Sequence, residues 1–369
     1  MMIYAEKQAR EQVVRAGLRL VESGLIARTW GNISARISQT QFVITPSGLA
    51  YETLEPEQLV VVNIADCSHE GEGKPSSEKG IHADAYRLRP DVGFVIHTHQ
   101  SNATLASLSG TVLPVDEDLR DRLGALVPCA AYGMPSTKKL RRAVAAVMTA
   151  YPDSPAVLLR HHGALCLGGS FEEAFAVADA LEIQCGRVLD LTEAAPDGSC
   201  PDFGESVRDG DGFSLVCNGT LTHYSLSAPT GSLPRAAALH AAIYRHFSVS
   251  RVFYDTDADV VAYSALGLPL PPLLDDVVQM AGAGVDCVTA RPDRVVRALR
   301  GRSAVLLQGA GALCLAENDD DRDALKLLLR KGCLAARYAK TLPECRPLGR
   351  MDAAIQRAVY VNKYAKRKG

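Results

Sequence analysis

The chain has 369 residues, of which 47% are hydrophobic and 22% charged, and its formal net charge is −2. This length allows two domains, and the near-neutral composition gives no sign of a nucleic-acid-binding protein. No apolar run has membrane length, and no charged-then-apolar segment with a small-residue cleavage site is found, so we expect a cytoplasmic protein that does not bind membranes. The ten cysteines form no Cys-x-x-Cys pair, which favours reduced thiols over disulfides.

Helical and strand-like patterns alternate along the first half of the chain. Residues 5–23 carry apolar side chains at helical spacing, and the β-branched runs 41–45 and 59–64 are predicted strands. A Pro-Ser-Ser-Glu sequence marks the start of a predicted helix over 77–88. Two buried strands and one long amphipathic helix are predicted at 94–98, 157–159 and 171–188. The mixture predicts a sheet flanked by helices and leaves the strand order open.

The chain also repeats itself. Residues 156–167, AVLLRHHGALCL, match residues 304–315, AVLLQGAGALCL, at nine of twelve positions. Upstream, IHADAYR at 81–87 matches LHAAIYR at 239–245, and a third, looser match precedes that pair. Three collinear matches indicate two related units.

Four segments follow from this repeat and from the composition between its halves. They are a first domain at 1–193, a linker at 194–211, a second copy at 212–345, and a C-terminal helix with a basic tail at 346–369. Asp, Gly, Ser and Pro residues predict the linker. Apolar residues at Ile355, Ala358 and Val359 predict that the closing helix packs against the body. The basic tail from Lys363 to Lys368 is expected to be a solvated end.

Histidines end two of the predicted strands. His97 and His99 stand two residues apart, so their side chains point to the same face of a strand. The pair His161-His162 ends the second strand. Three histidine nitrogens with an open fourth position are a common arrangement for catalytic zinc. Hydrogen-bonded histidines at strand ends would explain each motif taken alone.

Small polar residues gather in three further segments. Glu78 begins a helix, where an acidic residue often only complements the helix dipole, and Ser76 and Ser77 are ordinary capping residues. A helix start with two hydroxyls also suits a phosphate dianion. The turns predicted at 31–34 and 45–48 offer backbone N–H groups, although most such turns have no further role.

The order of these motifs resembles the class II aldolase/adducin family over residues 5–190. The motifs are Thr29-Trp30-Gly31-Asn32-Ile33-Ser34, Ile44-Thr45-Pro46-Ser47-Gly48, Pro75-Ser76-Ser77-Glu78, His97-Thr98-His99 and His161-His162-Gly163. The family includes fuculose-phosphate and rhamnulose-phosphate aldolases, ribulose-phosphate 4-epimerase, methylthioribulose-phosphate dehydratase and decarboxylases. The resemblance implies an α/β fold, a three-layer αβα domain with a largely antiparallel central sheet, here tandemly duplicated.

The resemblance also implies roles for individual residues. His97, His99 and His162 match the metal-binding histidines of the family, with zinc as the expected ion and manganese as the alternative, whereas His161 is not expected to bind. Glu78 matches the catalytic acid/base. The positions that match phosphate-binding residues are Gly31, Asn32, Ser47, Gly48, Ser76 and Ser77. The implied activity is that of a metal-dependent aldolase cleaving a small phosphorylated ketose through an enediolate; a 4-epimerase, a decarboxylase and an adducin-like scaffold are the alternatives.

Two departures from the family pattern bear on mechanism. Family aldolases carry a tyrosine after the His-x-His motif, where this chain has the acidic stretch from Val115 to Leu119. In the second copy, ungapped extension of the matches places Asp255 and Asp257 opposite His97 and His99. The same extension places Ala236 opposite Glu78 and Ala310 opposite His162. We therefore expect a second copy that holds no metal.

The tandem arrangement predicts an assembly. Family aldolases form four-fold rings with active sites between neighbouring subunits, so a homodimer of this chain would form a pseudo-tetrameric ring. The missing proton donor would then come from the second copy or from the closing helix, where Tyr360 and Tyr364 are candidates.

Overall fold

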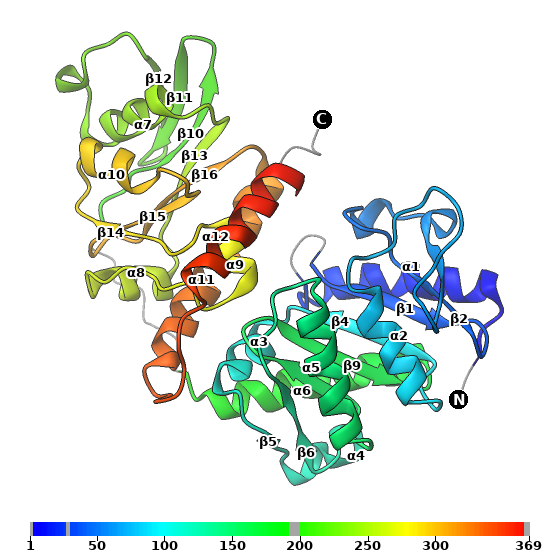
Figure 1. Cartoon of the computed structure of the whole chain (residues 1–369). Coiled ribbons are helices and arrows are strands. Elements are labelled where there is room, and N and C mark those ends of the chain that lie inside the picture. The colour runs from blue at the N-terminus through cyan, green and yellow to red at the C-terminus, as the bar shows by residue number, and fades with distance from the viewer. Residues whose placement is uncertain (1–2, 27–29, 192–199, 365–369) are drawn as a thin grey trace. The chain divides into compact units, whose positions relative to one another are not determined.

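A computed structural model of the chain describes residues 3–26, 30–191 and 200–364. The chain divides into two compact units (Figure 1), Met1–Asp190 with Leu342–Cys345 and Leu191–Thr341 with Arg346–Gly369. Thr29, in the first predicted motif, and the tail residues 365–369 lie outside the described residues. Among the described residues, no helix combines the length and apolar character needed to cross a bilayer.

The first unit is built on a seven-stranded sheet with the order β3-β2-β1-β4-β9-β8-β7. Its strands are β1 (Asn32–Arg36), β2 (Gln41–Ile44), β3 (Val60–Asn63), β4 (Phe94–Thr98), β7 (Cys129–Ala130), β8 (Ala156–Leu159) and β9 (Gly163–Gly168). Strands β7 and β8 pair in parallel, whereas the other neighbouring strands in this order pair antiparallel. A separate pair is formed by β5 (Leu113–Pro114) and β6 (Leu126–Val127).

Helices cover both faces of this sheet. They are α1 (Glu6–Glu22), α2 (Lys79–Leu88), α3 (Ser101–Ala106), α4 (Arg120–Leu123), α5 (Lys138–Ala150) and α6 (Phe171–Leu189). Residues of α1, α3 and α6 form one hydrophobic cluster with Phe94 and Ile96 of β4, whereas residues of α2 and α5 cluster with Val95. Because strand side chains alternate between faces, His97 lies on the same side as Val95, the side of α2. The three-layer αβα prediction is confirmed.

The largest difference from the predicted elements lies at residues 31–34. The sequence predicts a turn there, but Asn32–Arg36 is the central strand β1. The polar residues of this strand are buried and form hydrogen bonds. Ser34 Oγ lies 2.7 Å from His82 Nδ1, and Arg36 Nε donates to the carbonyl of Val92 at 2.9 Å. A polar strand of this kind has no apolar alternation to reveal it.

The second unit contains a seven-stranded sheet in the corresponding order, β12-β11-β10-β13-β16-β15-β14. Its strands are β10 (Glu205–Asp209), β11 (Gly212–Cys217), β12 (Thr220–Ser225), β13 (Arg251–Asp255), β14 (Cys287–Val288), β15 (Ala304–Leu307) and β16 (Ala312–Ala316). Its helices are α7 (Arg235–His246), α8 (Ala258–Ala265), α9 (Asp275–Met280), α10 (Pro292–Ala298), α11 (Asp319–Ala339) and α12 (Arg350–Val359). The strand β10 falls inside the predicted linker at 194–211, so that part of the prediction is wrong. Like β1, this strand is polar and gave no strand signal.

Sheet register also corrects the alignment of the two units. Thr98 pairs with Ala164, and Asp255 pairs with Ala312, the residue that matches Ala164 in the repeat. Asp255 therefore occupies the place of Thr98, and His97 and His99 correspond to Tyr254 and Thr256. The ungapped alignment is wrong by one residue because the turn between α7 and β13 is one residue shorter than its counterpart between α2 and β4.

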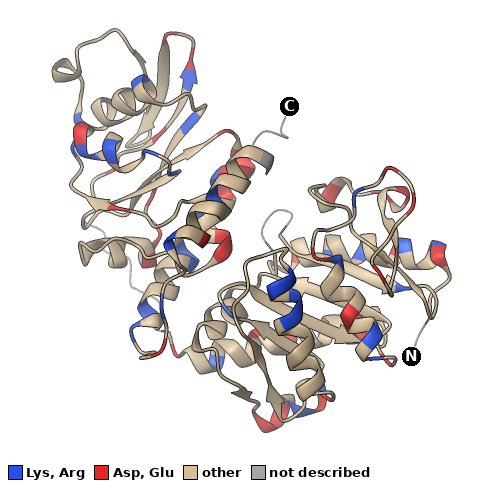
Figure 2. Cartoon of the chain, in the orientation of Figure 1, with Lys and Arg blue, Asp and Glu red and all other residues tan. Residues whose placement is uncertain are grey.

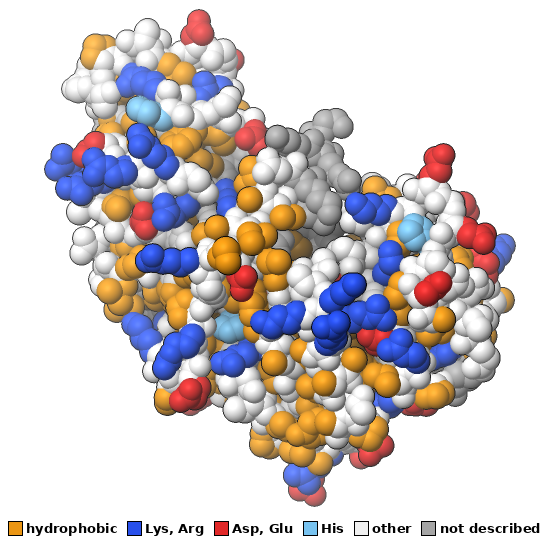
Figure 3. Space-filling view, viewed as in Figure 1, with side chains coloured by type: hydrophobic (Ala, Val, Ile, Leu, Met, Phe, Trp, Pro, Cys, Tyr) orange, Lys and Arg blue, Asp and Glu red, His pale blue; other side chains and the backbone are white. Residues whose placement is uncertain are grey.

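The closing helix α12 exists as predicted but buries a different face. Ala353 and Gln356 are its buried residues, and Gln356 Nε2 donates to Asp275 Oδ1 of α9 at 2.7 Å. Ile355 and Val359, predicted to pack, are 42% and 45% exposed, and Met351 is 75% exposed. Hydrophobic side chains are accordingly visible over this helix (Figure 3). Polar bonds from α12, which spacing could not reveal, therefore lie on its buried face: besides Gln356, Arg357 donates to the carbonyls of Gln279 and Met280.

Asp255 makes the second unit sensitive to pH. Its side chain is 3% exposed, and its Oδ2 has no hydrogen-bond partner among the described residues. Burial raises the pKa of Asp255 to about 6. Because the folded state holds this proton more tightly than the unfolded state, the stability of the unit falls as pH rises from about 4 through 6.

We expect Asp255→Asn to remove this loss and to stabilise the second unit by about 2 kcal/mol at pH 7.5. Thermal unfolding of both proteins at pH 4.5 and 7.5 measures the effect. The two curves should differ more at pH 7.5; an equal difference at both pH values would contradict the prediction.

Candidate active site

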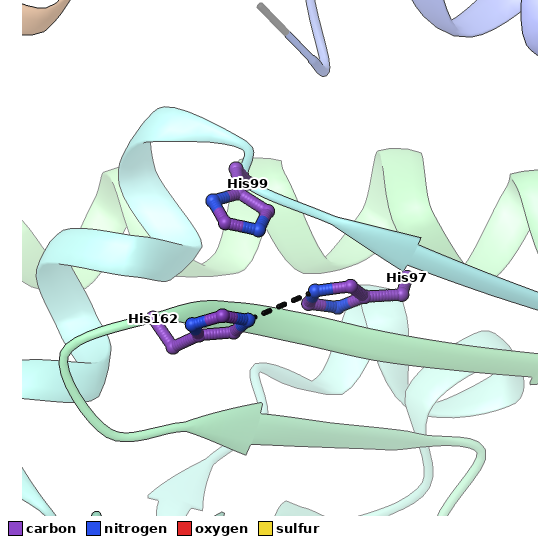
Figure 4. Close-up of side chains that lie close together, drawn as sticks. All are labelled: His97, His99 and His162. Atoms are coloured by element: carbon purple, nitrogen blue, oxygen red, sulfur yellow. Dashed lines mark hydrogen bonds between the residues drawn. The ribbon is translucent and has the colours of Figure 1, made fainter. Parts of the chain in front are cut away.

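Three imidazoles converge at the ends of central strands of the first sheet (Figure 4). His97 and His99 come from the end of β4, and His162 comes from the turn between β8 and β9. Antiparallel pairing of β4 with β9 brings these strand ends together, and the three ligand atoms lie within 4.8 Å of one another. The rings of His97 and His162 are nearly parallel, and their Nε2 atoms face each other 3.1 Å apart. All three side chains are at least nine-tenths buried.

The local backbone conformation directs His162, and not the adjacent His161, toward the imidazole cluster. His161 has a φ of 66°, a left-handed conformation that turns its side chain against Tyr132, with ring centroids 5.5 Å apart. A Cβ atom at Gly163 would collide with the carbonyl of Thr98, so this close approach of the two strands requires glycine. As expected, His161 does not belong to the imidazole cluster.

Glu78 faces the cluster from the start of α2. Its Oε2 lies 3.1 Å from His97 Nε2, and its Oε1 lies 3.6 Å from His162 Nε2. Burial alone would raise the pKa of Glu78, but the nearby His162 and His97 outweigh it and hold the pKa well below its usual range. The backbone N–H of Ser136 donates to Oε1 at 3.2 Å, and Asn32 Nδ2 lies 3.5 Å from Oε2. The carboxylate thus lies between the imidazole cluster and two N–H donors.

These residues fit a divalent metal ion. The Nδ1 atom of His97 lies 2.8 Å from the carbonyl of Ala164, which can only accept, so this nitrogen carries the proton. The Nε2 lone pair of His97 is therefore directed at the cluster, as in histidines whose second nitrogen is fixed by a carbonyl. Three imidazoles with an adjacent carboxylate are a donor set suited to zinc and similar ions.

The structure also brings together the three segments predicted to bind phosphate. Pro46 and Pro75 form an isolated bridge, Ser47 N donates to Lys74 O at 2.9 Å, and Ser76 N donates to Thr45 O at 3.0 Å. The Oγ of Thr45 in turn accepts from the N–H of Ile33 at 3.2 Å, so the segments around residues 32, 46 and 76 are in contact.

Within these segments the predicted residues differ in accessibility. Gly48 and Ser77 are exposed, Gly31 and Ser47 are half-buried, and Asn32 and Ser76 are buried. Gly31 has a φ of 114°, and a Cβ atom there would lie 2.6 Å from the His97 carbonyl. Ser77 Oγ lies 2.7 Å from Ser136 Oγ, just ahead of α5. This helix begins with two lysines followed by two arginines one residue later, and its basic side is blue in Figure 2. Exposed hydroxyls beside lysines suit an anionic substrate group.

The acidic stretch at 115–119 does not join the site. Asp116 and Asp118 both form ion pairs with Arg187 of α6, at 3.0 and 2.8 Å, and all three side chains are largely exposed. Hydrogen bonds from Arg187 lower the pKa of Asp118, so this carboxylate remains ionised and is a poor replacement for the tyrosine of the family.

Two residues near the site were not identified from the sequence. Ser136 acts through its backbone N–H, which leaves no side-chain signal. His82 is fully buried and bonds to Asn32, but in the sequence it stands in the middle of an amphipathic helix pattern. Its repetition as His240 in the second unit was the only signal that could have found it.

An αβα domain with three histidines and a carboxylate at the end of an antiparallel strand pair has the architecture of a class II aldolase. The chain belongs to the class II aldolase and adducin family: the family profile described as "Class II Aldolase and Adducin N-terminal domain" matches residues 11–189. The match lies within the first unit, which is an enzyme of the class II aldolase type.

Individual proteins with similar sequences or structures carry related names. A 5-deoxy-D-ribulose 1-phosphate aldolase from Bacillus thuringiensis serovar kurstaki is 38% identical over 190 residues, which cover 51% of this chain and 87% of that protein. Among solved structures, an L-fuculose 1-phosphate aldolase is 28% identical, with a TM-score of 0.46, covering 52% of this chain and 91% of the other. An L-fuculose 1-phosphate aldolase from Thermus thermophilus is 28% identical, with a TM-score of 0.43, and the match covers 48% and 91% of the two chains.

Proposed function

We propose that the first unit is a metal-dependent carbon–carbon lyase that cleaves a small phosphorylated ketose through an enediolate. The observation that carries this proposal is the placement of Glu78 within 3.1 Å of the imidazole cluster, beside a rim of hydroxyls and backbone donors. The relative from Bacillus thuringiensis is named for a ketose 1-phosphate, which supports the substrate class.

Each group has a task in this proposal. A divalent ion held by His97, His99 and His162, with zinc expected and manganese the alternative, supplies a Lewis acid for the charge that develops on the substrate oxygens. Glu78 moves a proton to or from the carbon that bears this charge. The residues Gly31, Asn32, Ser47, Gly48, Ser76 and Ser77 hold the phosphate, which orients the reacting end of the substrate.

A substrate panel tests the proposal. Purified protein is incubated with L-fuculose 1-phosphate, 5-deoxy-D-ribulose 1-phosphate, a pentulose 5-phosphate and a phosphorylated sugar acid. We expect release of a triose phosphate from a ketose 1-phosphate. Epimerisation of the pentulose phosphate or release of carbon dioxide would instead indicate one of the related activities, and no reaction with any compound would favour a scaffold.

We further propose that the second unit is a degenerate copy of the first. Its sheet has the corresponding strand order. The position of the carboxylate is taken by Ala236, and the positions of the three imidazoles are taken by Tyr254, Thr256 and Ala310. Among the described residues, the only group of three or more potential metal ligands is the one in the first unit. The copy would then contribute to assembly, since a covalent link raises the effective concentration of neighbouring units.

This proposal predicts a dimer. Light scattering should give a mass near twice 39.5 kDa, and a chain truncated after residue 195 should lose activity while it still binds metal. Tyr360 and Tyr364 remain the candidate proton donors, so their replacement by Phe should lower turnover. Full turnover by a truncated, monomeric first unit would refute the proposal that the active site needs residues from a neighbouring unit.

A further inference from the structure

A buried chain of hydrogen bonds connects the core of the first unit to Glu78. Tyr86 OH lies 2.7 Å from Ser34 Oγ, and Ser34 Oγ lies 2.7 Å from His82 Nδ1. His82 Nε2 lies 2.5 Å from Asn32 Oδ1, and Asn32 Nδ2 faces Glu78 at 3.5 Å. The side chains of Tyr86, Ser34, His82, Asn32 and Glu78 are all at least nine-tenths buried.

The direction of each hydrogen bond in this series follows from the Glu78 carboxylate at its end. A carboxylate only accepts hydrogen bonds, so Asn32 must present its amide nitrogen to Glu78 and its oxygen to His82. His82 must then carry its proton on Nε2, because that nitrogen donates to Asn32 Oδ1. Its Nδ1 accepts the hydroxyl proton of Ser34, which in turn accepts from Tyr86. Burial lowers the pKa of His82 to about 3, so the ring stays neutral at any pH near neutrality.

We propose that His82 is a positioning residue, which fixes the Asn32 amide so that it directs an N–H group at Glu78. The proposal rests on the proposed acid/base role of Glu78. Without the His82 donor, the amide of Asn32 can turn over and place its oxygen against the carboxylate, where it repels the charge. A fixed donor keeps the carboxylate aligned with the reacting carbon.

The second unit provides an internal comparison. Ser206 Oγ lies 2.6 Å from His240 Nδ1 and 2.9 Å from Tyr244 OH, which reproduces the Ser34–His82–Tyr86 group. Gly204, however, stands in the place of Asn32, and Ala236 in the place of Glu78. The histidine, serine and tyrosine therefore belong to the fold of both units, whereas the bond from the histidine to an asparagine is confined to the unit with the carboxylate.

This comparison supplies matched variants. His82→Phe removes the donor, His82→Gln retains an N–H donor, and His240→Phe makes the same change in the second unit, where the histidine is equally buried. We expect His82→Phe to lower kcat by about 10- to 100-fold, and His82→Gln to stay within about threefold of the unmodified protein. His240→Phe should lower thermal stability to a similar extent without a comparable loss of kcat. Metal content is measured for each variant. Unchanged kcat in a folded His82→Phe protein would overturn the proposal.

A readout independent of activity decides the amide orientation. In protein labelled with ¹⁵N-histidine, long-range proton–nitrogen NMR correlations identify which ring nitrogen of His82 is protonated, with His82→Gln providing the assignment. We expect the Nε2–H form from pH 5 to 9. The Nδ1–H form would mean that Asn32 is turned over, and would overturn the proposal even if kcat changes. Should no ketose phosphate be cleaved, the proposed function fails, while the NMR result still decides the role of His82.

Discussion

Replacing His162 with alanine is expected to abolish both metal binding and turnover. The side chain supplies one of three imidazoles whose ligand atoms lie within 4.8 Å, and its Nε2 lies 3.1 Å from that of His97. Two remaining histidines leave a divalent ion with too few protein ligands for the arrangement seen in catalytic zinc sites. Elemental analysis after gel filtration should fall from one ion per chain to none, and activity should fall to background.

The adjacent histidine is the control. His161 points away from the cluster, so His161→Gly should retain the metal. Glycine is the better substitution than alanine because the residue has a φ of 66°, and the second unit carries Gly309 at the matching position, with a φ of 69°. Loss of metal in His161→Gly, or two tightly bound transition ions per unmodified chain, would contradict the assignment of the ligands and of the metal-free second unit.

Replacing Glu78 with glutamine is expected to lower turnover by about a hundredfold or more, while metal stays bound. Glutamine keeps the size of the side chain but cannot take up a proton. Its amide would also meet the N–H groups of Asn32 and Ser136, which now donate to a carboxylate. The measurement is kcat together with metal content and the affinity for inorganic phosphate, which should survive.

A matched control for this change is Glu173→Gln. Glu173 is an exposed carboxylate in the first turn of α6, which accepts from the N–H of Gly169 at 2.8 Å, outside the site. The Glu173→Gln variant should leave turnover unchanged. If Glu78→Gln turns over at a near-normal rate, some other group carries the proton.

The convergence of the three histidines could be predicted from the sequence better than the strands of the sheet. The alternation of strand side chains was sufficient to place His97 and His99 together, and an ordered series of motifs joined them to His162 and Glu78. Strands β1 and β10 were missed because they carry polar residues whose partners lie elsewhere: Ser34 and Ser206 bond to His82 and His240, and the partners of Arg36 and Arg208 are backbone carbonyls. Hydrophobic periodicity cannot detect such a strand. The shift by one residue between the units was missed because a shortened turn leaves no mark on the residues beside it, whereas strand pairing reports it directly.

The packing role of α12 was missed for a related reason. A helix pattern identifies which residues are apolar. In α12, however, the buried face carries Gln356, which bonds to Asp275 of α9, whereas Ile355 and Val359 are exposed. The roles of His82 and Ser136 depend on contacts between segments about 50 to 60 residues apart in the chain, 50 for His82 with Asn32 and 58 for Ser136 with Glu78. Such pairings are determined by the tertiary structure alone.

The glycine at position 204 also bears on evolution. Gly204 has a φ of 74°, and a Cβ atom there would collide with the carbonyl of Val216, so no asparagine fits where the first unit has Asn32. Restoring histidines and a glutamate by point mutation would therefore not recreate the site in the second unit, since position 204 cannot take an asparagine without a change in the main chain. A return to catalysis would therefore require a change in the main chain as well as in the side chains.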